Sequence, residues 1–284
     1  MASVAVATHL SAFLFLFPSS VTRLLRSSSL YLRNPSLYQS KTWYFSEPRW
    51  KNLDFYALLI SLPLSSFSEI FIFLTLPSDH PSDHRFAFAH QSLVLFLFWA
   101  LLLFIVLREN VDFFHVNEGL VFLFAAISFL SEFSILGRNG VTGVSGTGYE
   151  LLSFLSLVCA FCCLFLSVRP SSFFAEFLLS LGMVFKGTWV LQIGLFLYSD
   201  AFGFRGCGRV ENVDVVKCDV EEDGFRAVAL MRLSFVGHAV LVLVLGFVSF
   251  GFLSSEQKLR FDEAGGSLLA QLDSETIRHE LEME

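Results

Sequence analysis

Three ionisable side chains that interrupt long apolar stretches are the residues best placed to do chemistry: Glu69, Lys186 and His238. Lys186 lies nearest the middle of its stretch and would need a carboxylate partner, because a charge at the centre of a bilayer costs roughly 2.5–3.5 kcal/mol. Helical spacing places Glu69 and His238 at a similar depth, so the three could form one polar layer. Such a layer could bind a proton or a small polar ligand. It could also be a structural contact that only holds helices together, which is the interpretation we favour.

Four further side chains fall within about two turns of the helix ends on one side of the membrane: His90, Glu132, Glu150 and Arg232. Together with the deeper layer they predict a polar funnel that opens toward that side. Taken singly, each is better explained as an interfacial residue in contact with water. Glu118 and Glu132 are fourteen residues apart, which places them on one face of a helix.

The five cysteines fall into two groups. Cys207 and Cys218 flank ten residues of a polar loop, and they are a candidate disulfide if that loop faces an oxidising compartment. With the opposite orientation they would be two free thiols. Cys159, Cys162 and Cys163 lie in an apolar run and are expected to pack as small side chains, because a zinc site needs four ligands.

No pattern in the sequence is typical of catalysis. A Gly-rich phosphate loop, a nucleophile elbow and a zinc-hydrolase helix are all missing from it. We therefore expect a protein that is not an enzyme and that holds neither a cofactor nor a metal. The net charge of −7 comes without a basic stripe, so a nucleic-acid partner is not expected either.

The elements that must position these residues are long apolar helices. Hydrophobic residues make up 54% of the 284 residues and charged ones only 16%, whereas soluble domains carry charge at about a quarter of their residues. Continuous apolar runs of about 20 residues predict membrane-spanning helices, since backbone amides in lipid must pair within the segment. The predicted fold is all-α, a polytopic membrane helix bundle over 1–253. About seven transmembrane helices are expected, at 4–19, 53–76, 87–107, 113–136, 149–168, 173–199 and 228–253.

The first of these spans has a second explanation. Its apolar stretch is short, Pro18 closes it, and the segment after it is rich in Ser and Arg. Those features are shared by transit peptides that are removed from the mature protein. Both a genuine span and a removed leader therefore stay open.

The loops and the tail predict an orientation. With the N-terminus outside or in a lumen, the inner loops and tail hold eleven Lys or Arg residues and the outer loops hold six. The acidic tail at 254–284 would then be cytosolic, and we expect it to be mostly disordered. It offers a site for a protein partner, while the lipid bilayer is the partner of everything before it.

The ordered set of features resembles the plant-type members of the transmembrane protein 45 family, also called domain of unknown function 716. The similarity covers about 5–253 and rests on 68–72 around Glu69, 88–93 around His90, and 185–189 around Lys186, together with the paired cysteines of the last long loop. The resemblance implies a seven-helix membrane protein and no established biochemical activity.

This chain departs from the family pattern in two places. The family carries a histidine-rich stretch near the end of the fourth span, where this chain reads Phe133 to Gly140 with no histidine. Lys186 stands where the family usually has a neutral Gln. A metal or haem role suggested by the family's histidines is therefore not expected in this chain.

The sequence predicts a non-enzymatic structural or trafficking component of endomembranes or the plasma membrane. The alternative is a proton-coupled or small-solute carrier or channel that uses Glu69, Lys186 and His238. A seven-helix receptor is a further alternative, permitted by the helix count alone.

Overall fold

The computed structural model describes residues 2–45, 52–75, 82–110, 116–136, 143–198, 206–210 and 215–281. Within them the chain forms long α-helices, one short 3-10 turn and one β-hairpin, which confirms the prediction of an all-α bundle. The elements are α1 (Ala2–Arg33), η1 (Pro35–Leu37), α2 (Leu53–Thr75), α3 (Ser82–Asn110), α4 (Glu118–Leu136), α5 (Gly143–Val168), α6 (Phe173–Tyr198), β1 (Cys207–Val210), β2 (Val215–Cys218) and α7 (Glu221–Leu281).

Six helices in the described part of the chain, α2 to α7, are long and apolar enough to cross a membrane. The predicted boundaries at 76, 113 and 199 lie outside the described residues. The predicted first span lies within α1, which continues as helix through Pro18 to Arg33. Its crossing of the membrane stays a prediction.

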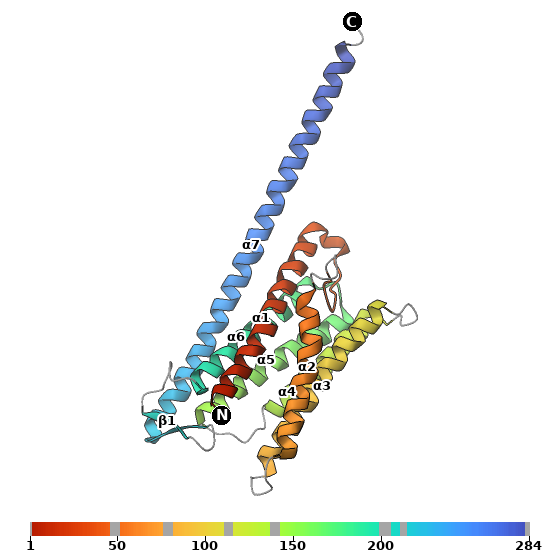
Figure 1. The fold of residues 1–284 in the computed structure, drawn as a ribbon. Coiled ribbons are helices and arrows are strands. Elements are labelled where there is room, and N and C mark those ends of the chain that lie inside the picture. Colours follow the sequence, from red (N-terminus) through yellow and green to blue (C-terminus); the bar gives the residue numbers. More distant parts are fainter. Residues whose placement is uncertain are drawn as a thin grey trace.

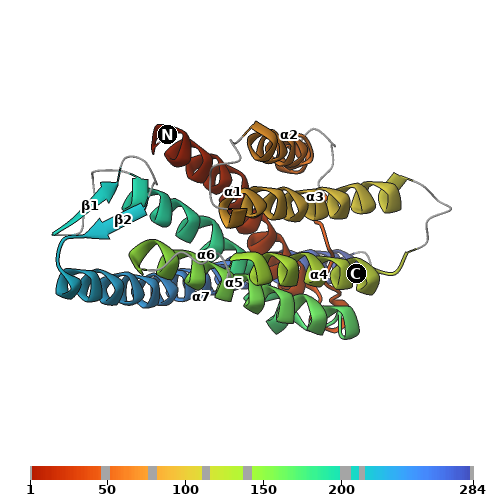
Figure 2. The same ribbon diagram turned by 90° about the horizontal axis from the view of Figure 1, so that it is seen from below.

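The helices pack side by side in one bundle (Figure 1), and the start of α1 and the β-hairpin lie at the same end of it. Two groups of buried apolar side chains form the core. One is built from α2 to α6, and the other from α1 and α5 to α7. Helices α5 and α6 contribute to both groups, and the view turned by 90° (Figure 2) shows α2 and α7 at the periphery.

Helix α1 fits closely against α6 because two glycines of α6 lie under it. A Cβ added at Gly187 would lie 3.2 Å from the Cβ of Leu16, and one added at Gly194 would lie 2.5 Å from the Cβ of His9. The two glycines are seven residues apart, so they lie on one face of α6. They let the two backbones approach as small residues do in membrane helix pairs.

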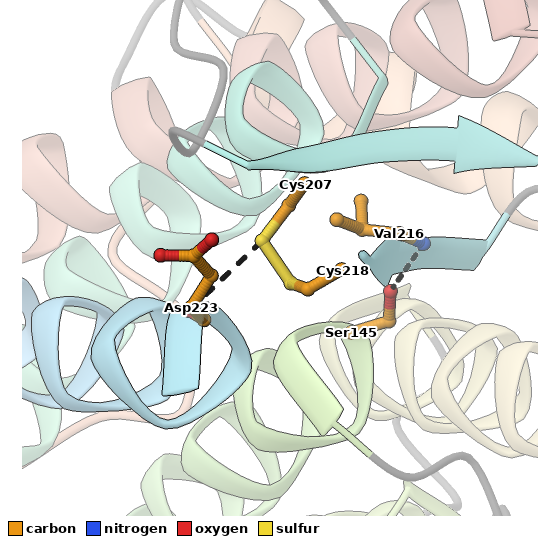
Figure 3. The surroundings of a disulfide bond; sticks show 5 residues. All are labelled: Ser145, Cys207, Val216, Cys218 and Asp223. Carbon is orange, nitrogen blue, oxygen red and sulfur yellow. Dashed lines mark hydrogen bonds between the residues drawn. A yellow bond between two sulfur atoms is a disulfide. The ribbon is translucent and has the colours of Figure 1, made fainter. Parts of the chain in front are cut away.

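The end of the bundle near the start of α1 carries the β-hairpin (Figure 3). Cys207 and Cys218 face each other in its register and form a disulfide. The hairpin is held on α5, because the backbone N–H of Val216 donates to Ser145 Oγ at 3.5 Å. Cys207 Sγ also lies 4.0 Å from the main-chain oxygen of Asp223 in the first turn of α7.

Helix α7 continues past its apolar stretch to Leu281 and extends beyond the other helices (Figure 1). The expectation of a mostly disordered cytosolic tail at 254–284 stays a prediction. The tail has no proline and is rich in Glu and Leu, which are good helix formers, although the pair Gly265 and Gly266 in its middle is unfavourable for a helix.

Candidate polar sites inside the bundle

Lys186 finds its carboxylate partner on α4. Its ammonium group pairs with Glu132 Oε2, which also accepts a hydrogen bond from Ser156 Oγ of α5 at 3.1 Å. The ammonium also lies over the rings of Phe129 and Phe98, at 5.0 and 5.8 Å from their centroids. Lys186 is only 6% exposed, so this cluster joins α4, α5 and α6 inside the bundle.

His238 of α7 forms a second polar contact on α6. Its Nδ1 pairs with Gln192 Oε1, and its Nε2 lies 2.9 Å from Thr188 Oγ1. The amide nitrogen of Gln192 donates to Ser234 Oγ of α7. Thr188 and Gln192 follow Lys186 by two and six residues, which places them about 200° and 240° around the helix axis. His238 and Lys186 therefore lie on different faces of α6.

The six residues predicted as one polar cluster are brought together only in part. The structure joins Lys186 to Glu132, whereas we had expected Glu69 as its partner. Glu69 is half-buried on α2, a helix that packs chiefly against α3. His90 and Arg232 are exposed on the outside of the bundle, as is Glu150.

A second buried ion pair lies toward the end of the bundle where α1 ends. Arg23 of α1 contacts Glu176 in the first turn of α6 at 2.9 Å, and the Glu176 side chain has no exposed surface. The Tyr44 hydroxyl donates to the same carboxylate at 3.4 Å and lies 3.3 Å from the Tyr38 hydroxyl. Arg23 also donates to the backbone oxygen of Thr42 at 2.7 Å.

Glu118 of α4 also holds the chain segment that contains Thr42. Its Oε2 accepts hydrogen bonds from the backbone N–H of Thr42 at 3.0 Å and from its hydroxyl at 2.9 Å. Its other oxygen pairs with Arg108 at the end of α3, at 2.6 Å. We call this group the end cluster, and it consists of Arg23, Tyr38, Thr42, Tyr44, Arg108, Glu118 and Glu176. It fastens the segment 38–45 across the ends of α3, α4 and α6.

Burial in the end cluster changes the ionisation of its two tyrosines. Loss of solvent, and after it the nearby Glu176 carboxylate, raise the pKa of Tyr38 to about 12. The same two causes raise the pKa of Tyr44 well above its usual value. Both phenols are therefore neutral hydrogen-bonding groups at physiological pH.

The end cluster was not predicted from the sequence. Glu118 and Glu176 lie near helix ends, where exposure to water is cheap, and Arg23 follows the apolar stretch as one of several basic residues. The sequence contains two signals that could have indicated it. One is a lone acid in the first turn of an apolar helix, and the other is a cation in a segment without acids. Pairing them required knowing that α1 lies against α6.

The Lys186 cluster, the His238 contact and the end cluster contain carboxylates and an imidazole, but they do not gather metal ligands. Among the described residues, no group of three or more His, Cys, Asp or Glu side chains could hold a metal ion. What the arrangement can do chemically is to neutralise charge between helices. Lys186, His238 and the charged side chains of the end cluster each contact a partner from another element.

Comparison with known proteins agrees with this picture of a membrane domain without an assigned activity. Residues 118–251 match the model of a family described as "Family of unknown function (DUF716)". The match covers α4 to α6 and the apolar part of α7, so it includes Glu132, Lys186 and His238. It supports the resemblance to that family found in the sequence. No curated protein matches the chain.

Proposed function

We propose that this chain is a plant-type protein of the transmembrane protein 45 group within DUF716, and that it acts as a non-enzymatic structural or trafficking component of an endomembrane or the plasma membrane. The family match supports a membrane protein without an assigned activity. The proposal rests on one observation, the way in which polar contacts are used inside the bundle.

Polar contacts link every helix of the bundle to at least one neighbour. Arg23 joins α1 to α6, Glu132 and Ser156 join α4 and α5 to Lys186 of α6, and His238 joins α7 to α6. The remaining helices are joined in the same manner. Arg108 pairs with Glu118 between α3 and α4, and Ser66 and Ser92 exchange hydrogen bonds between α2 and α3.

Such contacts suit a scaffold better than a transport path. Within lipid the hydrophobic effect does not drive helices together, so packing and interhelical polar contacts must do so. A group that moves a proton or solute must exchange its partner during the cycle. Glu132, by contrast, accepts from Lys186 and Ser156 at once, and Glu176 accepts from Arg23 and Tyr44.

The orientation that we propose places the hairpin end outside or in a lumen and the end cluster toward the cytosol. The disulfide in the hairpin supports this, because disulfides persist in oxidising compartments. The Lys and Arg residues of 23–51 support it too, since basic residues favour the cytosolic side.

The test is to reconstitute the full chain in liposomes that contain a pH-sensitive dye and, separately, to cross-link it in intact membranes. We expect proton and solute flux no faster than in protein-free liposomes, together with a partner protein that stays bound in stoichiometric amount. A chain that binds only lipid would contradict a structural or trafficking role. So would flux that depends on the polar residues.

A carrier for protons or a small polar solute is the second candidate. It is favoured by one observation: His238 of α7 contacts α6 at Thr188, two residues along the helix from Lys186. If this candidate is right, flux above the protein-free level is lost when Lys186→Met and Glu132→Gln are combined. The melting temperature of that double variant must stay near that of the parent for the result to count.

A further inference from the structure

Three exposed cations lie in chain segments that come together where α1 ends, although the segments are far apart in the sequence. Arg33 is the last residue of α1, Lys41 lies in the segment after η1, and Arg169 lies in the turn between α5 and α6. All three are exposed, whereas the cations of the end cluster are partly or fully buried against carboxylates.

Two contacts bring these segments together. The backbone N–H of Ser40 donates to the backbone oxygen of Pro170 at 2.7 Å, which places Lys41 beside the turn that carries Arg169. The ring of Tyr31 stacks on Phe173 with centroids 4.0 Å apart and an angle of 6° between the planes. This stacking brings the last turn of α1, with Arg33, to the first residue of α6.

The chain segments that carry these three cations add no negative charge of their own, and among the described residues the other acids at this end are Asp54 of α2 and Glu109 of α3. The sequence holds no acid in 20–45 or in 164–175. The nearest carboxylates of the end cluster are already paired, Glu176 with Arg23 and Glu118 with Arg108. Helix α7 lies beside this end of the bundle, where the ring of Phe250 contacts the ring of Phe173. The first two charges that α7 adds beyond Phe250 are one acid and one base, at 256 and 258, and they cancel.

Apolar side chains are exposed next to the same cations. Leu37 is 80% exposed, Val168 is 79% exposed and Leu30 is 42% exposed. The short turn 169–172 joins two helices that are long and apolar enough to cross a membrane, so it must lie at the bilayer surface. Exposed apolar groups beside exposed cations are typical of a surface that sits among lipid headgroups.

We propose that Arg33, Lys41 and Arg169 form a binding site for the headgroup of an anionic phospholipid in the leaflet at this end of the bundle. The phosphate is bound by the two guanidinium groups, which match its oxygens in pairs, and by the ammonium group as a point charge. Leu37 and Val168 contact the upper part of the acyl chains. The acidic tail of the chain itself does not cover the site, because α7 carries it away from the bundle as continuous helix (Figure 1).

The test uses the full chain in nanodiscs of phosphatidylcholine, alone or with phosphatidylglycerol at increasing fractions. Lipid that stays bound is counted by native mass spectrometry, and the melting temperature is recorded in parallel. We expect phosphatidylglycerol to be retained selectively and to raise the melting temperature. Arg33→Gln, Lys41→Gln and Arg169→Gln combined should weaken its binding by about 100-fold, since each cation near an anionic surface contributes about fivefold.

The matched control removes exposed cations at the opposite end, Arg226→Gln with Arg232→Gln, and should leave the preference for phosphatidylglycerol unchanged. Equal melting temperatures of the triple variant and the parent in phosphatidylcholine alone establish that the triple variant is folded. If it unfolds, Lys41→Gln alone, expected to weaken binding about fivefold, replaces it.

The proposal is overturned if the control weakens binding as much as the triple variant, or if the variants bind phosphatidylglycerol as the parent does. It is also overturned if inorganic phosphate added to phosphatidylcholine nanodiscs gives the same rise in melting temperature.

Discussion

The contact of Lys186 with Glu132 shows how a charge is kept inside an apolar bundle. Each partner alone would leave an uncompensated ion away from water, and breaking a buried pair from one side typically costs about 3–5 kcal/mol. Replacing both partners with uncharged groups of similar size removes the cost of taking two ions out of water as well as the attraction between them. Single and double substitutions of the pair therefore test whether these charges act as a structural contact.

We predict that Glu132→Gln or Lys186→Met alone lowers the free energy of unfolding by about 3 kcal/mol or more, whereas the combined variant loses much less than the sum. Reversible unfolding in mixed detergent micelles measures all four members of this cycle. Glu150→Gln is the control, because that carboxylate lies exposed on α5, and it should change little. Additive losses in the double variant would show that the two side chains do not act as a pair.

The tyrosines of the end cluster predict a transition at high pH. Burial raises the pKa of Tyr38 from 10.0 to about 12, so the folded protein favours the neutral phenol. The stability that this phenol contributes is complete below pH 10 and is lost as the pH rises from 10 to 12. The absorbance of tyrosinate and the melting temperature, recorded over this range, should change together.

Tyr38→Phe should remove part of that alkaline loss and should cost about 1 kcal/mol at neutral pH, because its hydroxyl contacts Tyr44 and Ser40. Tyr56→Phe is the matched control, since that phenol is 43% exposed on α2. An alkaline transition of equal size in the parent and in Tyr38→Phe would contradict the assignment.

At the scale of elements, the packing of α1 on α6 depends on the space left by two glycines. A methyl group at Gly194 would meet the Cβ of His9 at 2.5 Å, closer than side chains approach without a shift of the backbone. We predict that Gly194→Ala lowers the free energy of unfolding by about 1–3 kcal/mol, which is usual when a packed interface is overfilled. Melting in nanodiscs measures the loss.

Gly237→Ala on α7 is the control for this prediction, because nothing lies within 4 Å of a Cβ added there. It should leave the stability unchanged or raise it slightly, since Ala favours helix over Gly. Were both variants equally stable, α1 would not be held against α6 in the way the structure describes. A cross-link between cysteines introduced on the two helices, lost in Gly194→Ala, would locate the effect at this contact.

The helices were predictable from sequence because the thickness of a bilayer fixes their length and the absence of water fixes their type. Their rotation about their own axes was not, since lipid accepts any apolar face equally. For that reason Lys186 was recognised as a deep charge, but its partner on α4 was not identified.

The end cluster was not predicted for a related reason. Thr42 and Tyr44 lie in an irregular segment whose path over the helix ends depends on contacts far apart in the sequence, Arg23 with Glu176 and Thr42 with Glu118.

At the scale of the whole molecule, the two ends of the bundle differ in chemistry. One end carries the start of α1 and a disulfide-bonded hairpin (Figure 1), and the other carries the end cluster together with Arg33, Lys41 and Arg169. A disulfide needs an oxidising compartment, whereas exposed Lys and Arg favour the cytosolic leaflet. Both rules support the orientation proposed above, although they rest on unrelated physical causes.

We predict that a membrane-impermeant reductant followed by an impermeant maleimide labels the chain in intact cells if it resides in the plasma membrane, or in inverted vesicles if it resides in an endomembrane. Cys159, Cys162 and Cys163 are buried in the bundle, so the label reports on Cys207 and Cys218. Labelling must vanish when both are changed to Ser.

The control adds Lys258→Cys to the variant in which Cys207 and Cys218 are Ser. Position 258 is exposed beyond the apolar part of α7, so it should be labelled only from the opposite side of the membrane. The reverse pattern would place the hairpin in the cytosol, where it would be reduced. The Lys and Arg residues near the end of α1 would then face the wrong leaflet for the orientation proposed above.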